Sequence, residues 1–182
     1  MTIEFDTAGI ATQQIPFMPS PNFDERPPGA AIELIVVHNI SLPPGQFGGD
    51  GIVDLFTNRL DPGAHPYYAT IAELKVSAHF LVRRDGALIQ FVPCTKRAWH
   101  AGESTWRARE RCNDFSIGIE LEGTDDQPFE NLQYAALTRL VRALRGAYGA
   151  LEMVGHSDIA PNRKTDPGPC FDWSRLRKGL MK

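Results

Sequence analysis

The sequence predicts an α/β (α+β) fold in which a central mixed β-sheet is flanked by helices. Three segments predict it: AIELIVVHNI is rich in β-branched residues, FSIGIELEG alternates apolar and polar residues, and NLQYAALTRLVRALRGAYG repeats apolar residues at helical spacing. Periods of two and of 3.6 residues are typical of strands and of amphipathic helices, respectively. Strands interspersed with helices along one chain favour a single sheet covered by helices.

Length and composition fit one domain that spans residues 1–182. Of the 182 residues, 42% are hydrophobic and 23% are charged, which is enough for a core that stands without disulfides. Residues 1–30 are rich in proline and weakly periodic, so we expect an extended N-terminal arm packed on this domain. Nothing in the pattern demands more than a monomer.

Charge and cysteine usage exclude several classes of protein. The net charge of −3 argues against a nucleic-acid binder, which usually carries a basic excess. We find no signal peptide and no apolar run as long as a membrane span, so we expect no membrane partner and a cytoplasmic location. The three cysteines, Cys94, Cys112 and Cys170, form neither a disulfide framework nor a CxxC zinc site, and we interpret each as reduced.

The first half of the chain predicts a strand, a helix and a long loop. Residues 31–40 predict a buried strand that ends at His38, before the turn signal LPPG. Residues 50–60 carry apolar side chains at helical spacing and predict a short helix. Residues 61–75 predict an irregular loop, which, like the loop at residues 43–50, could cover a groove and open for a ligand.

The middle of the chain predicts a hairpin, a strand and the longest helix. Residues 77–93 are two strand-like runs around Asp85-Gly86, a pair that suits a type I′ turn with both central residues at positive φ. Residues 98–114 predict a polar, irregular connection. Residues 115–123 predict a strand, and residues 131–149 predict an amphipathic helix.

The segment GHSDIAPNRKTDPGP, residues 155–169, concentrates titratable groups in a stretch that predicts neither a helix nor a regular strand. It contains His156, Lys164 and Asp166 among three prolines, and His38 stands at the end of the earlier strand. Two imidazoles and one carboxylate suit catalytic zinc, which keeps a fourth position for water. Spacing alone is a weak signal, because no HExxH helix is present and a single histidine is more often structural.

Glu120 is a candidate general base. In the alternating segment it shares a face with Ser116 and Gly118, which are small and leave room above the sheet. A half-enclosed carboxylate can have a raised pKa and accept a proton. The alternative is that Glu120 and Glu122 line a solvated face. Lys164 could stabilise a developing oxyanion, or it could be an ordinary surface lysine.

Two further clusters suggest a polar ligand. The segment that begins with Trp99 offers an aromatic face on which a sugar or a peptide could stack. Arg107, Arg109 and Arg111 could clamp a carboxylate through two parallel hydrogen bonds. Because glutamates interleave with these arginines, a self-neutralised surface loop fits the pattern equally well.

Five long blocks follow one another between about residues 19 and 180. They are VVHNISLPPGQFGG, SAHFLVRRDG, RAWHAG, RERCNDFSIGIELEGTD and GHSDIAPNRKTDPGPCFDWSR. In this order they resemble the type-2 N-acetylmuramoyl-L-alanine amidases, and among them the cytosolic zinc amidases of bacterial cell-wall recycling. The wider group shares its fold with the peptidoglycan-recognition proteins. The resemblance therefore implies a mixed sheet surrounded by helices, with zinc in a groove on one face.

The resemblance also implies roles for particular residues. One zinc ion would be held by His38, His156 and Asp166. The implied reaction is hydrolysis of the amide bond between (1,6-anhydro-)N-acetylmuramic acid and L-alanine. Glu120 would take the proton of the attacking water and pass it to the leaving nitrogen, while Lys164 would stabilise the oxyanion.

Other positions are assigned less directly. The resemblance implies that Asn39 and Arg111 contact the anhydromuramyl-peptide substrate. His79 and His100 belong to the matching blocks, but we do not assign them to the metal. Asp158 is our own candidate for the acceptor that fixes the tautomer of a ligand histidine.

Two alternatives stay open. Some relatives of this group bind peptidoglycan without cleaving it, so the chain could be a non-catalytic recognition module. Those proteins typically lose a zinc ligand, whereas all three positions are filled here. The other alternative is an amidase of the same fold that acts on intact cell wall.

Overall fold

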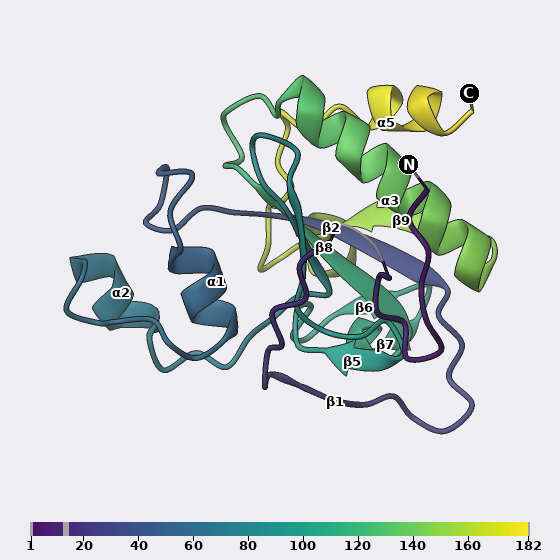
Figure 1. The fold of residues 1–182 in the computed structure, drawn as a ribbon, viewed down its shortest axis with the longest axis horizontal. Coiled ribbons are helices and arrows are strands. Elements are labelled where there is room, and N and C mark those ends of the chain that lie inside the picture. Colours follow the sequence, from purple (N-terminus) through teal and green to yellow (C-terminus); the bar gives the residue numbers. More distant parts are fainter. Residues whose placement is uncertain (1, 13–14, 182) are drawn as a thin grey trace.

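The computed structural model describes residues 2–12 and 15–181. Its main sheet has five strands in the order β4-β3-β8-β2-β9. Strands β3, β8, β2 and β9 run parallel, and β4 is antiparallel to β3. The predicted mixed sheet with helices around it is therefore confirmed (Figure 1).

The strands of the main sheet are β2 (Leu34–Ile40), β3 (Phe80–Val82), β4 (Leu88–Gln90), β8 (Ser116–Glu122) and β9 (Glu152–Gly155). Two small sheets add β1 (Phe23–Glu25) with β5 (Lys96–Ala98), and β6 (Thr105–Trp106) with β7 (Arg109–Glu110). The helices are α1 (Gly51–Phe56), α2 (Pro66–Ile71), α3 (Asn131–Tyr148), α4 (His156–Ile159) and α5 (Trp173–Leu180), with a 3-10 turn at Cys112–Asp114. Among the described residues, no helix is long and apolar enough to cross a membrane.

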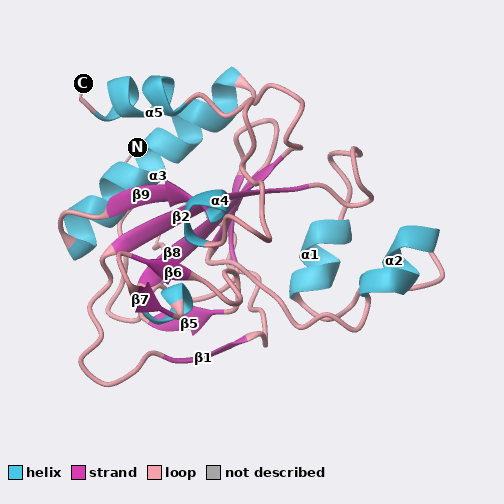
Figure 2. Ribbon diagram, turned by 180° about the vertical axis from the view of Figure 1, so that it is seen from behind, coloured by secondary structure: helices cyan, strands magenta, loops and turns pink. Residues whose placement is uncertain are grey.

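The two faces of the sheet have different covers. Helix α3 lies across one face with α5 beside it (Figures 1 and 2). Ile35 and Val37 of β2 and Ile117 and Ile119 of β8 point to this side and pack with the apolar stripe of α3 in the main core. Because side chains alternate along a strand, the next residues, among them His38 of β2, point to the opposite face.

The N-terminal arm is tied to the sheet through hydrogen bonds to its outer strand. The buried side-chain amide of Gln90 in β4 accepts from the backbone of Ala11 and donates to the carbonyl of Gly9. Met18 donates from its backbone to the carbonyl of the same Gln90. Arg26 lies further along the arm and donates to four backbone carbonyls of the domain. These contacts hold the arm on the domain, although it is not extended throughout, because residues 4–12 fold back through an antiparallel bridge between Phe5 and Ala11.

Residues 98–114 were predicted to be irregular but contain β6, β7 and the 3-10 turn at Cys112–Asp114. Three further local predictions were wrong. The predicted loop at residues 61–75 contains α2, which begins with Pro66 and has its first turn capped by the His65 ring. Proline suits this position because the first N–H groups of a helix have no intrahelical partner. The segment at residues 155–169 contains the short helix α4.

The third concerns the predicted hairpin, which exists, although not with a type I′ turn. Only Gly86 of its turn has positive φ, and Arg83 pairs with Ala87 across three loop residues. This is the three-residue loop with glycine in the left-handed position.

Candidate metal centre

The register of two parallel strands places His38 beside Glu120. The sequence predicted that the strand ends at His38, but β2 continues two residues further, to Ile40. In the pairing of β2 with β8, His38 lies opposite Glu120, so both side chains point to the face away from α3. Both are buried, with 1% and 9% of their surface exposed. The interpretation of this face of β8 as solvated is therefore wrong.

His156 and Asp166 come from the two sides of one loop. Strand β9 ends at Gly155, and His156 begins α4 immediately after it. The backbone of Ser157 donates to the carbonyl of Asp166 at 2.9 Å, which ties the sides together. Gly155 allows this approach, because an added Cβ would lie 2.7 Å from the ring of Pro167.

Three donor atoms converge at this point. Nδ1 of His38 lies 3.0 Å from Nδ1 of His156 and 3.0 Å from Oδ2 of Asp166, and the last two atoms are 3.1 Å apart. Donors 2.0–2.1 Å from a tetrahedral zinc are about 3.3 Å from one another, so this triangle is close to the size such an ion needs. The three residues therefore form a possible metal site.

The electrostatics favour the metal-binding forms of these side chains. Burial lowers the pKa of His38 to about 4, against the opposing hydrogen bond to Asp166. Burial raises the pKa of Asp166, but the hydrogen bonds to His156 and His38 outweigh it and hold the pKa well below its usual value. At neutral pH the site thus presents a neutral imidazole and an ionised carboxylate, the protonation states in which these groups bind metals.

Glu120 is suited to accept a proton. Burial, and next the charge of Asp166, raise its pKa well above the ordinary value, while Lys164 acts in the opposite direction. Its Oε2 is buried and has no hydrogen-bond partner among residues 2–12 and 15–181. A buried carboxylate oxygen without a partner is costly, and it is free to bond a water or a substrate atom.

A cleft of about 400 Å³ opens in front of these groups. His38, Glu120, His156, Lys164 and Asp166 all line it, so the sequence-predicted metal and catalytic residues lie in one cavity. The remaining wall is largely apolar and aromatic, and it comes from the loops after β2, from the α1–α2 region and from the segment around Trp99; among its members are Leu42, Pro44, Tyr67, Ile71, Leu74 and Val76. Both loops that were predicted to cover a groove contribute to this wall.

The two residues that were predicted to contact the substrate lie in different places, one in the cleft and one outside it. Asn39 lines the cleft, where its amide nitrogen donates to Asp125 and to the carbonyl of Pro167. Arg111 is well exposed and pairs with Asp114 outside the cleft wall. The three arginines do not form one clamp, because Arg107 and Arg109 pair with carboxylates of their own. Contact of Asn39 and Arg111 with substrate stays a prediction.

The hydrogen-bond partners of His38 and His156 differ from the predicted one. Asp158 accepts a hydrogen bond from the backbone of Gly155 and caps α4, so its predicted role toward a ligand ring is wrong. Instead, Nε2 of His156 faces the carbonyl of Ala101 at 3.1 Å, and Nε2 of His38 faces Nδ1 of His100 at 3.0 Å. The sequence predicted an aromatic face for the segment that begins with Trp99, but no spacing rule links this segment to His38 or His156.

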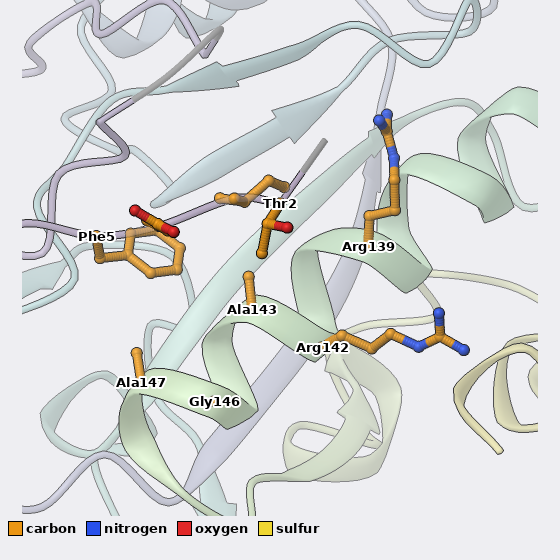
Figure 3. A pocket seen from close by; sticks show the side chains of 9 residues that line it. Thr2, Phe5, Arg139, Arg142, Ala143, Gly146 and Ala147 are labelled. Carbon is orange, nitrogen blue, oxygen red and sulfur yellow. The ribbon is translucent and has the colours of Figure 1, made fainter. Parts of the chain in front are cut away.

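A second hollow lies on the other side of the molecule. It is lined by Thr2–Phe5 of the arm and by Arg139, Arg142, Ala143, Gly146 and Ala147 of α3. In Figure 3, Thr2 and Phe5 lie across from Ala143 and Ala147. Helix α3 packs on the sheet face opposite His38. This hollow of about 630 Å³ contains none of the converging groups described above.

The fold and the site together define a class: a mixed-sheet hydrolase with a three-donor site beside a buried carboxylate. Residues 28–169 match the N-acetylmuramoyl-L-alanine amidase family. Over 167 residues, 91% of each chain, the sequence is 60% identical to 1,6-anhydro-N-acetylmuramyl-L-alanine amidase AmpD of Escherichia coli strain K12. The chain belongs to this amidase family.

Solved structures agree with this assignment. A crystal structure of a selenomethionine derivative of AmpD matches with a TM-score of 0.93 and 55% identity, over 97% of this chain and 98% of that one. The amidase AmiD of E. coli, in complex with anhydro-N-acetylmuramic acid-L-Ala-D-gamma-Glu-L-Lys, matches with a TM-score of 0.60 and 32% identity, over 85% of this chain and 60% of that one.

Proposed function

We propose that the chain hydrolyses the amide bond between 1,6-anhydro-N-acetylmuramic acid and the L-alanine of muropeptides, with one zinc ion as cofactor. The observation that carries this proposal is the convergence of His38, His156 and Asp166 beside Glu120 and Lys164 in one cleft. The similarity to AmpD over nearly the whole chain supports the anhydromuramyl substrate.

Zinc fits the donor set better than harder cations. Two imidazole nitrogens and one carboxylate oxygen are typical of catalytic zinc, whereas magnesium and calcium prefer oxygen ligands. When bound, zinc supplies a Lewis acid that polarises a carbonyl and lowers the pKa of a water molecule. His38, His156 and Asp166 would hold it by three donors, one from β2, one from the first residue of α4 and one from the loop that follows α4.

Glu120 supplies the proton transfers. Its unpartnered Oε2 takes a proton from the attacking water, and the carboxyl then gives the proton to the nitrogen of L-alanine as the amide bond breaks. The low polarity around the buried group keeps its proton affinity high enough for both steps. The raised pKa of Glu120 therefore suits a group that first accepts a proton and then donates it.

Lys164 and the apolar wall complete the cleft. The ammonium group of Lys164 lines the same cavity, and it stabilises the negative charge that develops on the carbonyl oxygen during attack. The apolar and aromatic residues opposite contact the less polar faces of the substrate and exclude water. Trp99 and Tyr67 both belong to this wall, and aromatic rings stack well on sugar faces.

We further propose that the protein acts as a single domain and monomer in the cytoplasm, on soluble fragments released during wall turnover. The family match from residue 28 to residue 169, together with the packed arm before it, supports a single unit. The similarity to AmpD over 91% of both chains supports the soluble substrate.

The test is a mass-spectrometric assay with zinc-loaded protein, with and without a chelator. A 1,6-anhydromuramyl tripeptide and intact peptidoglycan are offered in parallel. We expect release of free tripeptide from the small substrate, abolished by the chelator and restored by zinc. Binding without release would make the chain a recognition module, and faster release from intact wall would make it a wall amidase; either outcome contradicts the proposal.

A further inference from the structure

The His100 ring contacts His38 at the ring nitrogen that points away from the proposed metal position. Its ring meets the ring of His38 edge to face, with centroids 5.1 Å apart and an interplanar angle of 83°. Nδ1 of His100 lies 3.0 Å from Nε2 of His38, on the side of that ring away from Asp166. The ring nitrogens of His38 are thus both engaged, one by the donor triangle and one by His100.

The hydrogen positions along this contact follow from a chain of partners. Ser116 donates its hydroxyl hydrogen to the carbonyl of Cys112 at 2.6 Å. The Ser116 oxygen must therefore accept from Nε2 of His100, which lies 3.1 Å away. A neutral His100 then has a lone pair on Nδ1, and this lone pair accepts from Nε2–H of His38. The other nitrogen of His38, Nδ1, is left with its lone pair directed at the donor triangle.

His156 has the same tautomer, with hydrogen on Nε2, for a separate reason. Its Nε2 faces the carbonyl of Ala101, which only accepts, so Nε2 carries the hydrogen and Nδ1 the lone pair. Two consecutive residues, His100 and Ala101, therefore orient both ligand histidines. Their backbone N–H groups both donate to Oδ1 of buried Asn113, which fixes this pair of acceptors in place.

The His100 ring is held closely on the side that faces the sheet. It packs over Gly118 of β8, where an added Cβ would lie only 2.4 Å from Cγ of His100. His100 is largely buried, and the 9% of the residue that is exposed lies at the wall of the cleft. A protonated His100 would direct an Nδ1–H at the Nε2–H of His38, so the contact requires the neutral ring.

We propose that His100 is a positioning residue for the proposed zinc site: as a neutral acceptor it fixes the tautomer and the ring orientation of His38. The inference rests on the metal site proposed above. Most ligand histidines donate to a carboxylate, a carbonyl or a water, and loss of such a partner typically weakens metal affinity 10–100-fold. An imidazole acceptor orients His38 without adding a negative charge, which leaves the bound ion more electrophilic.

The first experiment measures zinc affinity by competition with a chromophoric chelator. His100→Phe keeps a flat ring in the same space but removes the acceptor, and we expect the zinc dissociation constant to rise about 10–100-fold. His100→Asn restores an acceptor at the place of Nδ1, and it should recover most of the affinity. An unchanged dissociation constant in His100→Phe, or equal losses in both variants, would overturn the proposal.

His79 offers a matched control. It is fully buried and packs against the His100 ring, with centroids 5.8 Å apart. Its own polar partners are Arg26, the backbone of Gly118 and the carbonyl of Lys96, and it makes no hydrogen bond to His38 or His156, so it tests the packing around His100 without the hydrogen bond to His38. His79→Gln should lower the melting temperature while the folded protein keeps its zinc affinity. If His79→Gln and His100→Phe weaken zinc binding equally, the effect of His100 is general loosening and the proposal fails.

The second experiment observes the hydrogen bond directly. In zinc-loaded wild-type protein, nitrogen NMR should show His38 protonated at Nε2 and His100 protonated at its own Nε2, with coupling across the N–H···N bond. Protonation of His100 at Nδ1 would contradict the inference. Neither experiment uses turnover, so a failed amidase assay and a failed positioning role are distinguishable.

Discussion

Ile119 and Glu120 are neighbours in β8, yet they belong to different chemical environments. Ile119 points into the core under α3 and is fully buried among apolar side chains. Glu120 points to the opposite face, where it is nearly as buried but has an oxygen without a hydrogen-bond partner in the part of the chain that the structure describes. One face of the strand contributes to stability, whereas the other holds a group whose burial opposes folding.

The comparison extends to the second buried glutamate of the same strand. Glu122 shares the face of Glu120, but its two oxygens accept from the backbone N–H groups of Gly48 and Arg84, and Arg83 lies nearby. The two carboxylates are both buried, but only that of Glu122 has hydrogen-bond partners for both oxygens. Glu120, the one with the unpartnered oxygen among the described residues, lines the cleft, as expected of the proton acceptor proposed above.

The largest effect is expected at the donor triangle. Asp166→Ala removes the anionic donor, so the protein should lose stoichiometric zinc on gel filtration and its amidase activity should fall to background. Asp126→Ala is the control, because this exposed carboxylate accepts only from Thr124 among the described residues and faces no ligand. Full zinc content in Asp166→Ala, measured by atomic absorption, would remove Asp166 from the ligand set.

The next effect separates proton transfer from metal binding. Glu120→Gln preserves the shape of the side chain but cannot take a proton, so kcat should fall about 10²–10⁴-fold. Zinc content should stay at one ion per chain, because Glu120 lies outside the donor triangle. Turnover within tenfold of wild type would show that another group is the base.

The sequence predicted strand β8 and helix α3 because both have a periodic pattern of apolar side chains. Alternation in β8 and the 3.6-residue stripe of α3 arise from local geometry, and both were confirmed. Burial of the polar face of β8 was not predictable in the same way. It depends on loops that cover that face, including the segment that holds His100, and no local pattern records which loop packs there.

The errors have the same origin. Helix α2 has one cap and one proline to mark its beginning, and it is only six residues long, so its periodic signal is weak. The outer nitrogens of His38 and His156 face His100 and Ala101, which lie more than fifty residues away from both in the chain. Long-range pairs of this kind depend on how the loop after β5 packs against β2 and α4, and they cannot be read from spacing.

A smaller effect tests the apolar side. Ile119→Ala leaves a cavity under α3 and should cost about 2–5 kcal/mol in the free energy of unfolding, measured by urea denaturation. Ile119→Val should cost about 0.5–1.5 kcal/mol and serves as the graded control. The folded fraction should keep its kcat, because the side chain faces away from the cleft. A loss of kcat without a loss of stability would contradict the separation of the two faces.

The smallest effect is a gain of stability when Glu120 is replaced. In the metal-free protein the pKa of Glu120 is raised well above its ordinary value, mainly by burial. The folded state therefore binds a proton that the unfolded state has released, so wild-type stability falls as pH rises from about 4.3 through the raised pKa, and is level above it. Gln is neutral throughout, so chelator-treated Glu120→Gln should equal wild type near pH 4 and be more stable at pH 8.

Urea denaturation of chelator-treated protein at the two pH values measures this difference. Each unit by which the folded pKa exceeds the unfolded one corresponds to about 1.4 kcal/mol. Glu122→Gln is the matched control: its carboxylate accepts two backbone hydrogen bonds, so the same substitution there should destabilise the protein at pH 8. If Glu120→Gln were less stable than wild type at pH 8, the buried carboxylate would be stabilising, and the two sides of β8 would not divide stability from catalysis.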